Sequence, residues 1–206
     1  MSAVRVKICG ITLLEDALLA ARLGADALGF NFWPGSRRFI DPGAARAIVD
    51  RLPPFVTAVG VFVNQPRAEI LTAASRSGVA ALQLHGDEPC EECEGYPLPV
   101  IKALRVAGPE SLVALERYRV SALLLDAPCA GFGGSGATFD WALARAGSGR
   151  APIILAGGLT PENVGAAVRE VRPFAVDVAS GVERSPGVKE PDKLRRFIDG
   201  AKKETL

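Results

Sequence analysis

The chain has 206 residues, of which 49% are hydrophobic and 23% charged, as in an ordinary globular protein. A formal net charge of +1 with scattered basic residues argues against a nucleic acid or a membrane surface as partner. No apolar run is long enough to cross a bilayer and the first residues do not form a signal peptide, so we expect a cytoplasmic location.

Short apolar, β-branched runs recur along the chain, and each is followed by a glycine-rich or polar turn and an amphipathic stretch. The eight runs begin near Val4, Ala27, Thr57, Ala81, Val100, Ala122, Pro152 and Phe174. Their starts lie 19 to 30 residues apart. This spacing indicates βαβ units and a parallel sheet.

Several stretches between the runs carry helix-start signals. Thr12 and Glu15 have the spacing of a capping box. The pairs Asp41-Pro42 and Thr160-Pro161 each read as an N-cap followed by proline at the first helical position. The fourth unit is the weakest, because the sequence EPCEECEG predicts only a short acidic helix.

Eight β/α units in about 200 residues predict one (β/α)8 TIM barrel with a parallel eight-stranded core, and we take residues 1–206 as a single domain. A doubly wound open sheet would need a glycine-rich phosphate loop after its first strand. The first turn is instead CGIT, which lacks the G-x-G-x-x-G pattern.

In such barrels the active site lies at the carboxyl ends of the strands. The predicted strand ends, or the loops that follow them, carry Cys9, Arg38, His85, Asp126, Gly157, Gly158, Ser180 and Gly181. The loops after the sixth, seventh and eighth strands are rich in glycine, with the sequences GFGGSG, AGGLTPEN and ASGVE. Backbone N–H groups in such loops can approach an anion closely, so we predict a phosphate site there.

The charged residues on the strands need partners if they face the barrel interior. Alternation predicts that Lys7 and Asp177 point inwards, so Asp177 should pair with Lys7 or with Arg38. Asp126 ends the run LLLD, where a carboxylate is either paired or functional. A Schiff-base lysine at Lys7 or Lys102 is a weaker alternative, because neither ends its strand as Cys9 does.

The pair Cys90 and Cys93 forms a CxxC, which invites a metal or redox interpretation. A four-ligand zinc site would need two more ligands, and His85, the single histidine, offers only a weak third. We therefore expect a structural or incidental role for this pair. Four cysteines, with Cys9 and Cys129, also do not make a disulfide framework in a chain of this size.

Taken together, the motifs resemble the phosphoribosylanthranilate isomerase family along essentially the whole chain. The matching segments are KICGIT, GFNFWPGSRR, VGVFVN, QLHGDE, LLLDA, GGSGATFDW, LAGGLTPENV and PFAVDVASGVERSPGVKE. Two departures are small: alanines stand in ILAGGL and DVASGVE where serine is frequent, and Glu190 stands where aspartate is common.

The resemblance implies an Amadori rearrangement in tryptophan biosynthesis, with Asp126 as general acid and Cys9 as general base. It implies that Arg38 holds the anthranilate carboxylate. His85, at a strand end, could be a second acid/base or a hydrogen-bond donor at the rim, and we place it near the substrate rather than among the catalytic residues. The resemblance assigns the phosphate to the backbone of Gly134, Ser135, Gly157, Gly158, Ser180 and Gly181. It implies no metal or organic cofactor, a small phosphosugar substrate, and a monomer or homodimer.

This chemistry sets requirements on both catalytic groups. A thiol acts as a base only as thiolate, so we expect a helix N-terminus directly after Cys9 and the charge of Lys7 to lower its pKa. The acid Asp126 must hold its proton, which burial would favour. The alternatives are a histidine-pathway isomerase, which has an acidic residue in place of Cys9, and a non-catalytic binding or redox module that uses Cys90 and Cys93.

Overall fold

The computed structural model describes residues 4–106, 108, 115–126 and 151–203. Eight parallel strands form a closed barrel in sequence order, and the last strand pairs with the first. The strands are β1 (Arg5–Cys9), β2 (Ala27–Asn31), β3 (Thr57–Phe62), β4 (Ala81–Leu84), β5 (Val100–Arg105), β6 (Ala122–Asp126), β7 (Ile153–Leu155) and β8 (Ala175–Val178). This confirms the predicted (β/α)8 barrel and the position of each predicted strand.

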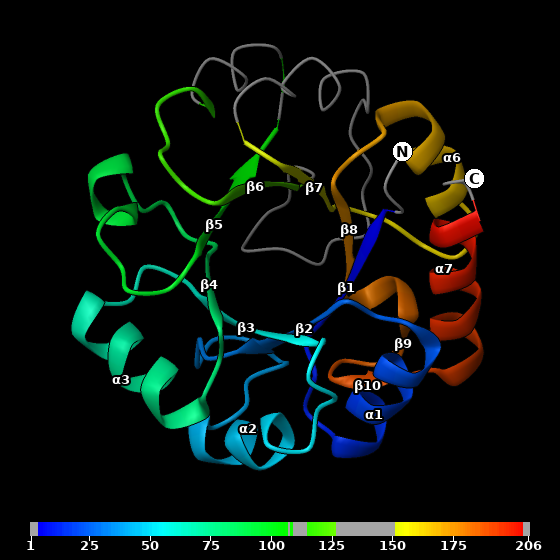
Figure 1. Ribbon diagram of the computed structural model, residues 1–206, viewed down its shortest axis with the longest axis horizontal. Helices are drawn as coiled ribbons and strands as arrows, with labels where there is room; N and C mark the ends of the chain where they lie inside the picture. The colour runs from blue at the N-terminus through cyan, green and yellow to red at the C-terminus, as the bar shows by residue number, and fades with distance from the viewer. Residues whose placement is uncertain (1–3, 107, 109–114, 127–150, 204–206) are drawn as a thin grey trace.

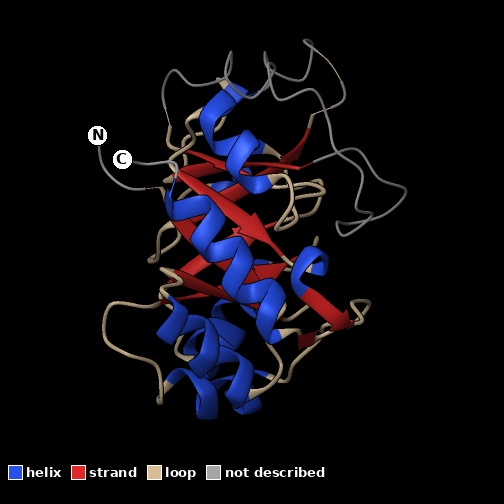
Figure 2. Cartoon of the chain, turned by 90° about the vertical axis from the view of Figure 1, so that its right-hand side faces the viewer, coloured by secondary structure: helices blue, strands red, loops and turns tan. Residues whose placement is uncertain are grey.

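Helices surround the barrel on its outside, and Figures 1 and 2 show the strands enclosed by them. They are α1 (Leu14–Leu23), α2 (Pro42–Val49), α3 (Arg67–Ser77), η1 (Cys90–Cys93), α6 (Val164–Val171), η2 (Ser180–Val182) and α7 (Pro191–Lys203). A small hairpin of β9 (Glu183–Ser185) and β10 (Val188–Lys189) follows η2. None of the helices in the described ranges is long and apolar enough to span a membrane.

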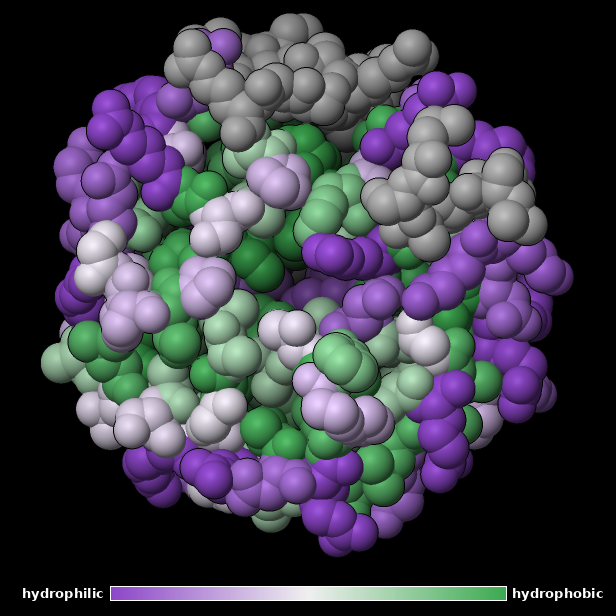
Figure 3. Space-filling view, viewed as in Figure 1, coloured by the Kyte–Doolittle hydropathy of each residue, from purple (hydrophilic) through white to green (hydrophobic). Residues whose placement is uncertain are grey.

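Hydrophobic side chains are buried in two places. The larger cluster lies between the sheet and the helices and includes Phe30, Phe62 and Phe197, each fully buried. Burying one such side chain contributes about 1.5–3 kcal/mol. A smaller cluster from β5 to β8 includes Ala103, Leu124 and Ile154 and fills part of the barrel interior. Hydrophilic residues gather on the periphery of the molecule, over the helices (Figure 3).

The start of α2 is as predicted. The Asp41 carboxylate accepts hydrogen bonds from the backbone N–H of Gly43 at 2.7 Å and of Ala44 at 3.4 Å, with Pro42 at the first position. The predicted capping box at Thr12 is wrong. Helix α1 begins at Leu14, and the Thr12 hydroxyl donates to the carbonyl oxygen of Gly187 at 2.5 Å instead.

The predicted start at Thr160-Pro161 is also wrong. Helix α6 begins at Val164, because the preceding residues form a separate turn. The Thr160 hydroxyl accepts from the N–H of Glu162 at 3.2 Å and so stabilises that turn. The Asn163 side chain fixes the same loop, accepting from the N–H of Thr160 at 2.8 Å and donating to the carbonyl of Gly158 at 2.9 Å.

Candidate active site

A single cavity at the carboxyl ends of the strands brings together every predicted site residue that the structure describes. Its lining includes Cys9, Arg38, His85, Asp126, Gly157, Gly158, Ser180 and Gly181. The other two predicted residues, Gly134 and Ser135, lie outside the described residues. Side chains from strands far apart in sequence therefore open into one space, as the barrel topology requires.

Cys9 is the last residue of β1, beside Gly29 of the neighbouring strand β2. A Cβ atom at position 29 would lie 2.8 Å from the Sγ of Cys9 and 3.1 Å from the Nζ of Lys7. Real Cβ atoms essentially never come as close as 2.8 Å to another atom, and 3.1 Å is tighter than most contacts, so the glycine provides the space that both side chains occupy.

The Lys7–Asp177 pairing predicted from strand alternation is confirmed. The Nζ of Lys7 lies 2.7 Å from the Oδ1 of Asp177, and both side chains are buried. Burial is the largest influence and opposes the charged form of Lys7, but the charges and hydrogen bonds of Asp177 and Cys9 together outweigh it and the pKa of Lys7 is raised. Lys7 also hydrogen-bonds the side chain of Cys9, so the same ammonium group contacts both a carboxylate and a thiol.

The expectation of a lowered pKa for Cys9 is wrong. Burial raises the pKa of this thiol, and the charge of Asp177 adds to the rise; Lys7 and Lys189 only partly offset them. Helix α1 begins five residues after Cys9 rather than directly after it.

Arg38 does not pair with Asp177, the second alternative from the sequence, but with Glu183 at the start of β9. Its Nε and Nη2 donate to the two carboxylate oxygens of Glu183 at 2.9 Å and 2.7 Å. The Nζ of Lys189 reaches the same carboxylate at 2.9 Å and the carbonyl of Cys9 at 2.5 Å. Burial favours the neutral form of Glu183, yet Arg38 and Lys189 hold its pKa below the ordinary value.

Asp126 ends β6 and meets His85, which follows β4. The Nε2 of His85 lies 3.3 Å from the Oδ2 of Asp126, and the Nδ1 lies 2.9 Å from the Nε2 of Gln83. The strand ends therefore join an amide, an imidazole and a carboxyl group in a chain of hydrogen bonds.

The glycine-rich loops after β7 and β8 lie against each other at the cavity. Gly157 and Gly158 have φ angles of 78° and 64°, which residues with a Cβ rarely adopt. A Cβ at Gly181 would lie 2.0 Å from the carbonyl oxygen of Leu159. The two loops can therefore approach only because these positions are glycines.

Lys102 and the CxxC pair lie apart from this cavity. Lys102 is buried and its Nζ donates to Glu88 at 2.6 Å and to the carbonyl of Gly86 at 2.8 Å. Cys90 and Cys93 lie in η1, and neither forms a disulfide. Within the described ranges, no group of three or more histidine, cysteine or acidic side chains could hold a metal ion.

Sequence reasoning missed Glu183, Lys189 and Asn31. Asn31 lines the cavity at the end of β2, and the alternation of Gly29 and Asn31 along that strand could have placed it there. Glu183 and Lys189 belong to the hairpin β9–β10, which is too short to leave a periodic signal.

Comparison with known proteins identifies the family. The sequence profile of N-(5'-phosphoribosyl)anthranilate (PRA) isomerase matches residues 6–200. The chain belongs to this family. The N-(5'-phosphoribosyl)anthranilate isomerase of Myxococcus xanthus is 50% identical over 210 residues, covering 99% of each chain.

Solved structures of the isomerase family agree in fold. The phosphoribosyl anthranilate isomerase of Thermotoga maritima has a TM-score of 0.92 and 50% identity, covering 97% of this chain and 99% of that one. A structure of the isomerase in complex with reduced 1-(o-carboxyphenylamino)-1-deoxyribulose 5-phosphate has a TM-score of 0.87 and 47% identity, with the same coverage.

Proposed function

We propose that this chain converts N-(5-phosphoribosyl)anthranilate, an aminoaldose, into 1-(2-carboxyphenylamino)-1-deoxyribulose 5-phosphate, an aminoketose, in tryptophan biosynthesis. The observation that carries the proposal is one cavity that combines a thiol, a carboxyl group, a guanidinium and two glycine-rich loops. The guanidinium suits the anthranilate carboxylate, the glycine-rich loops suit the phosphate, and the thiol and carboxyl group suit proton transfers at the sugar.

Asp126 is the general acid and Cys9 the general base. Asp126 donates a proton to the furanose ring oxygen, which opens the ring to an imine. The thiolate of Cys9 then removes the proton from C2′ to give an enaminol, which becomes the ketone as C1′ gains a proton and the 2′-hydroxyl loses one. Each positioned group contributes on the order of 10²–10⁴-fold to the rate. The hydrogen bond from Lys7 supports the thiolate form of Cys9 while it acts.

Arg38 binds the anthranilate carboxylate. Glu183 occupies Nε and one side of Nη2, and Nη1 donates to none of the described residues. The Nη1–Nη2 edge of the guanidinium is thus the edge available for a two-point contact with a carboxylate. Glu183 fixes the plane of that edge before substrate arrives.

The phosphate is held by backbone N–H groups of Gly157, Gly158, Ser180 and Gly181, with Gly134 and Ser135 completing the site. Support comes from the two positive-φ glycines and the close contact of the loops after β7 and β8. Successive N–H groups in such loops make anion-binding concavities.

The reaction consists of proton transfers, so the proposal includes no metal or organic cofactor. We also propose that residues 1–206 form one domain, since β1 and β8 from the two ends of the chain close the same barrel. The cavity is lined by residues of one chain, so the proposal accommodates a monomer or a homodimer. Light scattering coupled to gel filtration distinguishes them.

The test is isomerisation of freshly generated phosphoribosylanthranilate, followed by the loss of its anthranilate fluorescence. We expect turnover by the wild type and a loss of at least 10²-fold in kcat for both Cys9→Ser and Asp126→Asn. A folded wild-type protein without activity would show that the proposed substrate is wrong. An active wild type with an unaffected Cys9→Ser or Asp126→Asn variant would reject the assignment of that residue.

A further inference from the structure

Gln83 lies behind the acid Asp126, where the proposed reaction gives it no role. It is on β4, fully buried, and its register partners are Val61 on β3 and Ile101 on β5. A fully buried glutamine in an otherwise apolar strand is costly unless its hydrogen bonds serve a purpose. The Nε2 atom of Gln83 forms a hydrogen bond with the Nδ1 of His85 at 2.9 Å.

The direction of that hydrogen bond fixes where His85 carries its proton. An amide nitrogen only donates, so the Nδ1 of His85 must accept and the proton of the neutral ring must sit on Nε2. That N–H points at the Oδ2 of Asp126, 3.3 Å away. The amide thus selects the tautomer that presents a donor to the carboxyl group.

A donor in this position favours the carboxylate that Asp126 becomes once it has given its proton to the ring oxygen. The opposite tautomer would present a bare nitrogen to that new charge and oppose the transfer. The Oε1 of Gln83 is buried and has no hydrogen-bond partner among the residues that the structure describes. The orientation of the Gln83 amide therefore leaves its buried oxygen without a described partner, while its N–H stays directed at His85.

We infer that Gln83 is a positioning residue that holds His85 in the Nε2–H tautomer, so that the imidazole stabilises the ionised product form of Asp126. This inference rests on the proposed role of Asp126 as the acid. Its structural part, the tautomer, can be measured without any turnover.

The chain has a single histidine, so ¹⁵N labelling of histidine gives one imidazole signal set, free of overlap. The two ring nitrogens report the tautomer by their chemical shifts, recorded at pH 8, where free imidazole is neutral. We expect Nε2–H in the wild type, a mixture in Gln83→Met, and Nδ1–H in Gln83→Glu, because a carboxylate can only accept. We expect kcat to fall about tenfold in Gln83→Met, the worth of about one hydrogen bond, and KM to change less.

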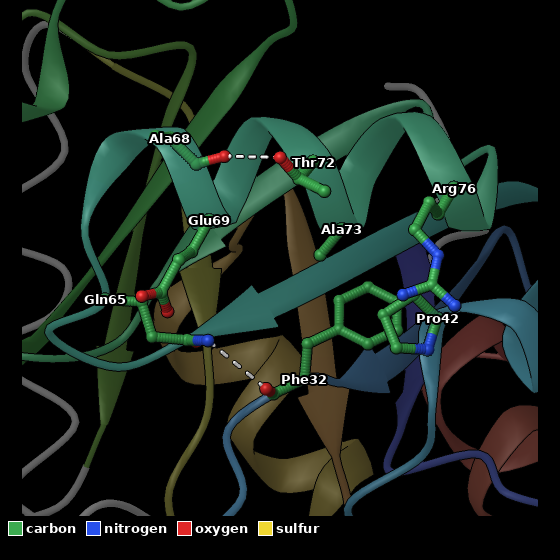
Figure 4. Close-up of a pocket in the computed structure, with 8 residues that line it drawn as sticks. All are labelled: Phe32, Pro42, Gln65, Ala68, Glu69, Thr72, Ala73 and Arg76. Atoms are coloured by element: carbon green, nitrogen blue, oxygen red, sulfur yellow. Dashed lines mark hydrogen bonds between the residues drawn. The ribbon is translucent and has the colours of Figure 1, made fainter.

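Gln65→Met is the matched control. Gln65 also has a buried Oε1 that no described residue hydrogen-bonds, and its Nε2 donates to the carbonyl of Phe32 at 3.3 Å. It lines a separate pocket beside α3 (Figure 4). Its loss should change neither the tautomer nor kcat. Nδ1–H in the wild type, or an unchanged tautomer in a folded Gln83→Met or Gln83→Glu, would overturn the inference. The expected tautomers without wild-type turnover would reject the proposed function instead.

Discussion

Arg38 donates three hydrogen bonds to the carboxylate of Glu183: Nε donates to Oε1 at 2.9 Å and to Oε2 at 3.1 Å, and Nη2 donates to Oε2 at 2.7 Å. The pair links the loop after β2 to the hairpin that follows β8, 145 residues later. Because Lys189 reaches the same carboxylate, Glu183 is a buried anion between two cations. The orientation of the guanidinium is therefore set by the protein rather than by the substrate.

We expect Glu183→Gln to raise KM about tenfold with a smaller effect on kcat. The amide offers one acceptor oxygen where the carboxylate offers two, so Arg38 loses part of its fixed orientation. The loss in substrate binding free energy should be about that of one charged hydrogen bond. Steady-state kinetics give both constants. Glu162→Gln, in an exposed pair with Arg196, is the control and should leave both unchanged. An equal loss in kcat with constant KM would contradict a binding role for Arg38.

Activity should rise with pH through the alkaline range. Only the thiolate of Cys9 accepts a proton, and burial raises the pKa of this thiol, so the active form is lost as pH falls through that raised value. Asp177→Asn removes a negative charge that raises the pKa of Cys9, so it should move this limb of the kcat/KM profile to lower pH. A shift to higher pH in that variant would contradict the assigned base.

The thiolate can be followed directly by its ultraviolet absorbance. A background with Cys90→Ser, Cys93→Ser and Cys129→Ser isolates Cys9 as the only titrating thiol. The absorbance and the kinetic limb should then titrate together.

Lys102→Met should destabilise the chain by about 3 kcal/mol or more while kcat stays within about twofold. The substitution leaves Glu88 buried without its cation, although two backbone N–H groups, of Asn64 and Gly86, still donate to it. Urea unfolding measures the loss. Asp50→Ala, in an exposed helical pair with Arg46, should leave the free energy of unfolding nearly unchanged. Covalent trapping of substrate on Lys102 by borohydride would revive the Schiff-base alternative.

Replacing Cys90 and Cys93 by serine should leave isomerase activity intact. Both lie in η1 outside the cavity, and burial raises the pKa of Cys93 to about 11, so it is a weak nucleophile at neutral pH. Alkylation at pH 8 should modify Cys93 only slowly in the folded chain. Loss of activity in the folded double variant would favour the redox module considered from the sequence.

The eight strands were predictable because each is a short apolar run bounded by turn residues, a local property. The cap at Thr12 was not, since its hydroxyl bonds Gly187, which is 175 residues away. The pKa of Cys9 depends on burial and on the charge of Asp177, which lies on β8, the strand that pairs with β1. A local sequence pattern around Cys9 contains neither. Strand alternation did predict Lys7–Asp177, because register and facing direction follow from the barrel itself.

The Lys7–Asp177 ion pair spans 170 residues and crosses the junction of the first and last strands. Contacts at such large sequence separation form late in folding, because the loop entropy must be overcome first. The environment of the Cys9 thiol, the proposed base, is therefore incomplete until the barrel closes. During refolding, recovery of turnover should lag behind recovery of helical signal. A circular permutant opened between α2 and β3 would keep this junction covalently continuous and shorten the lag.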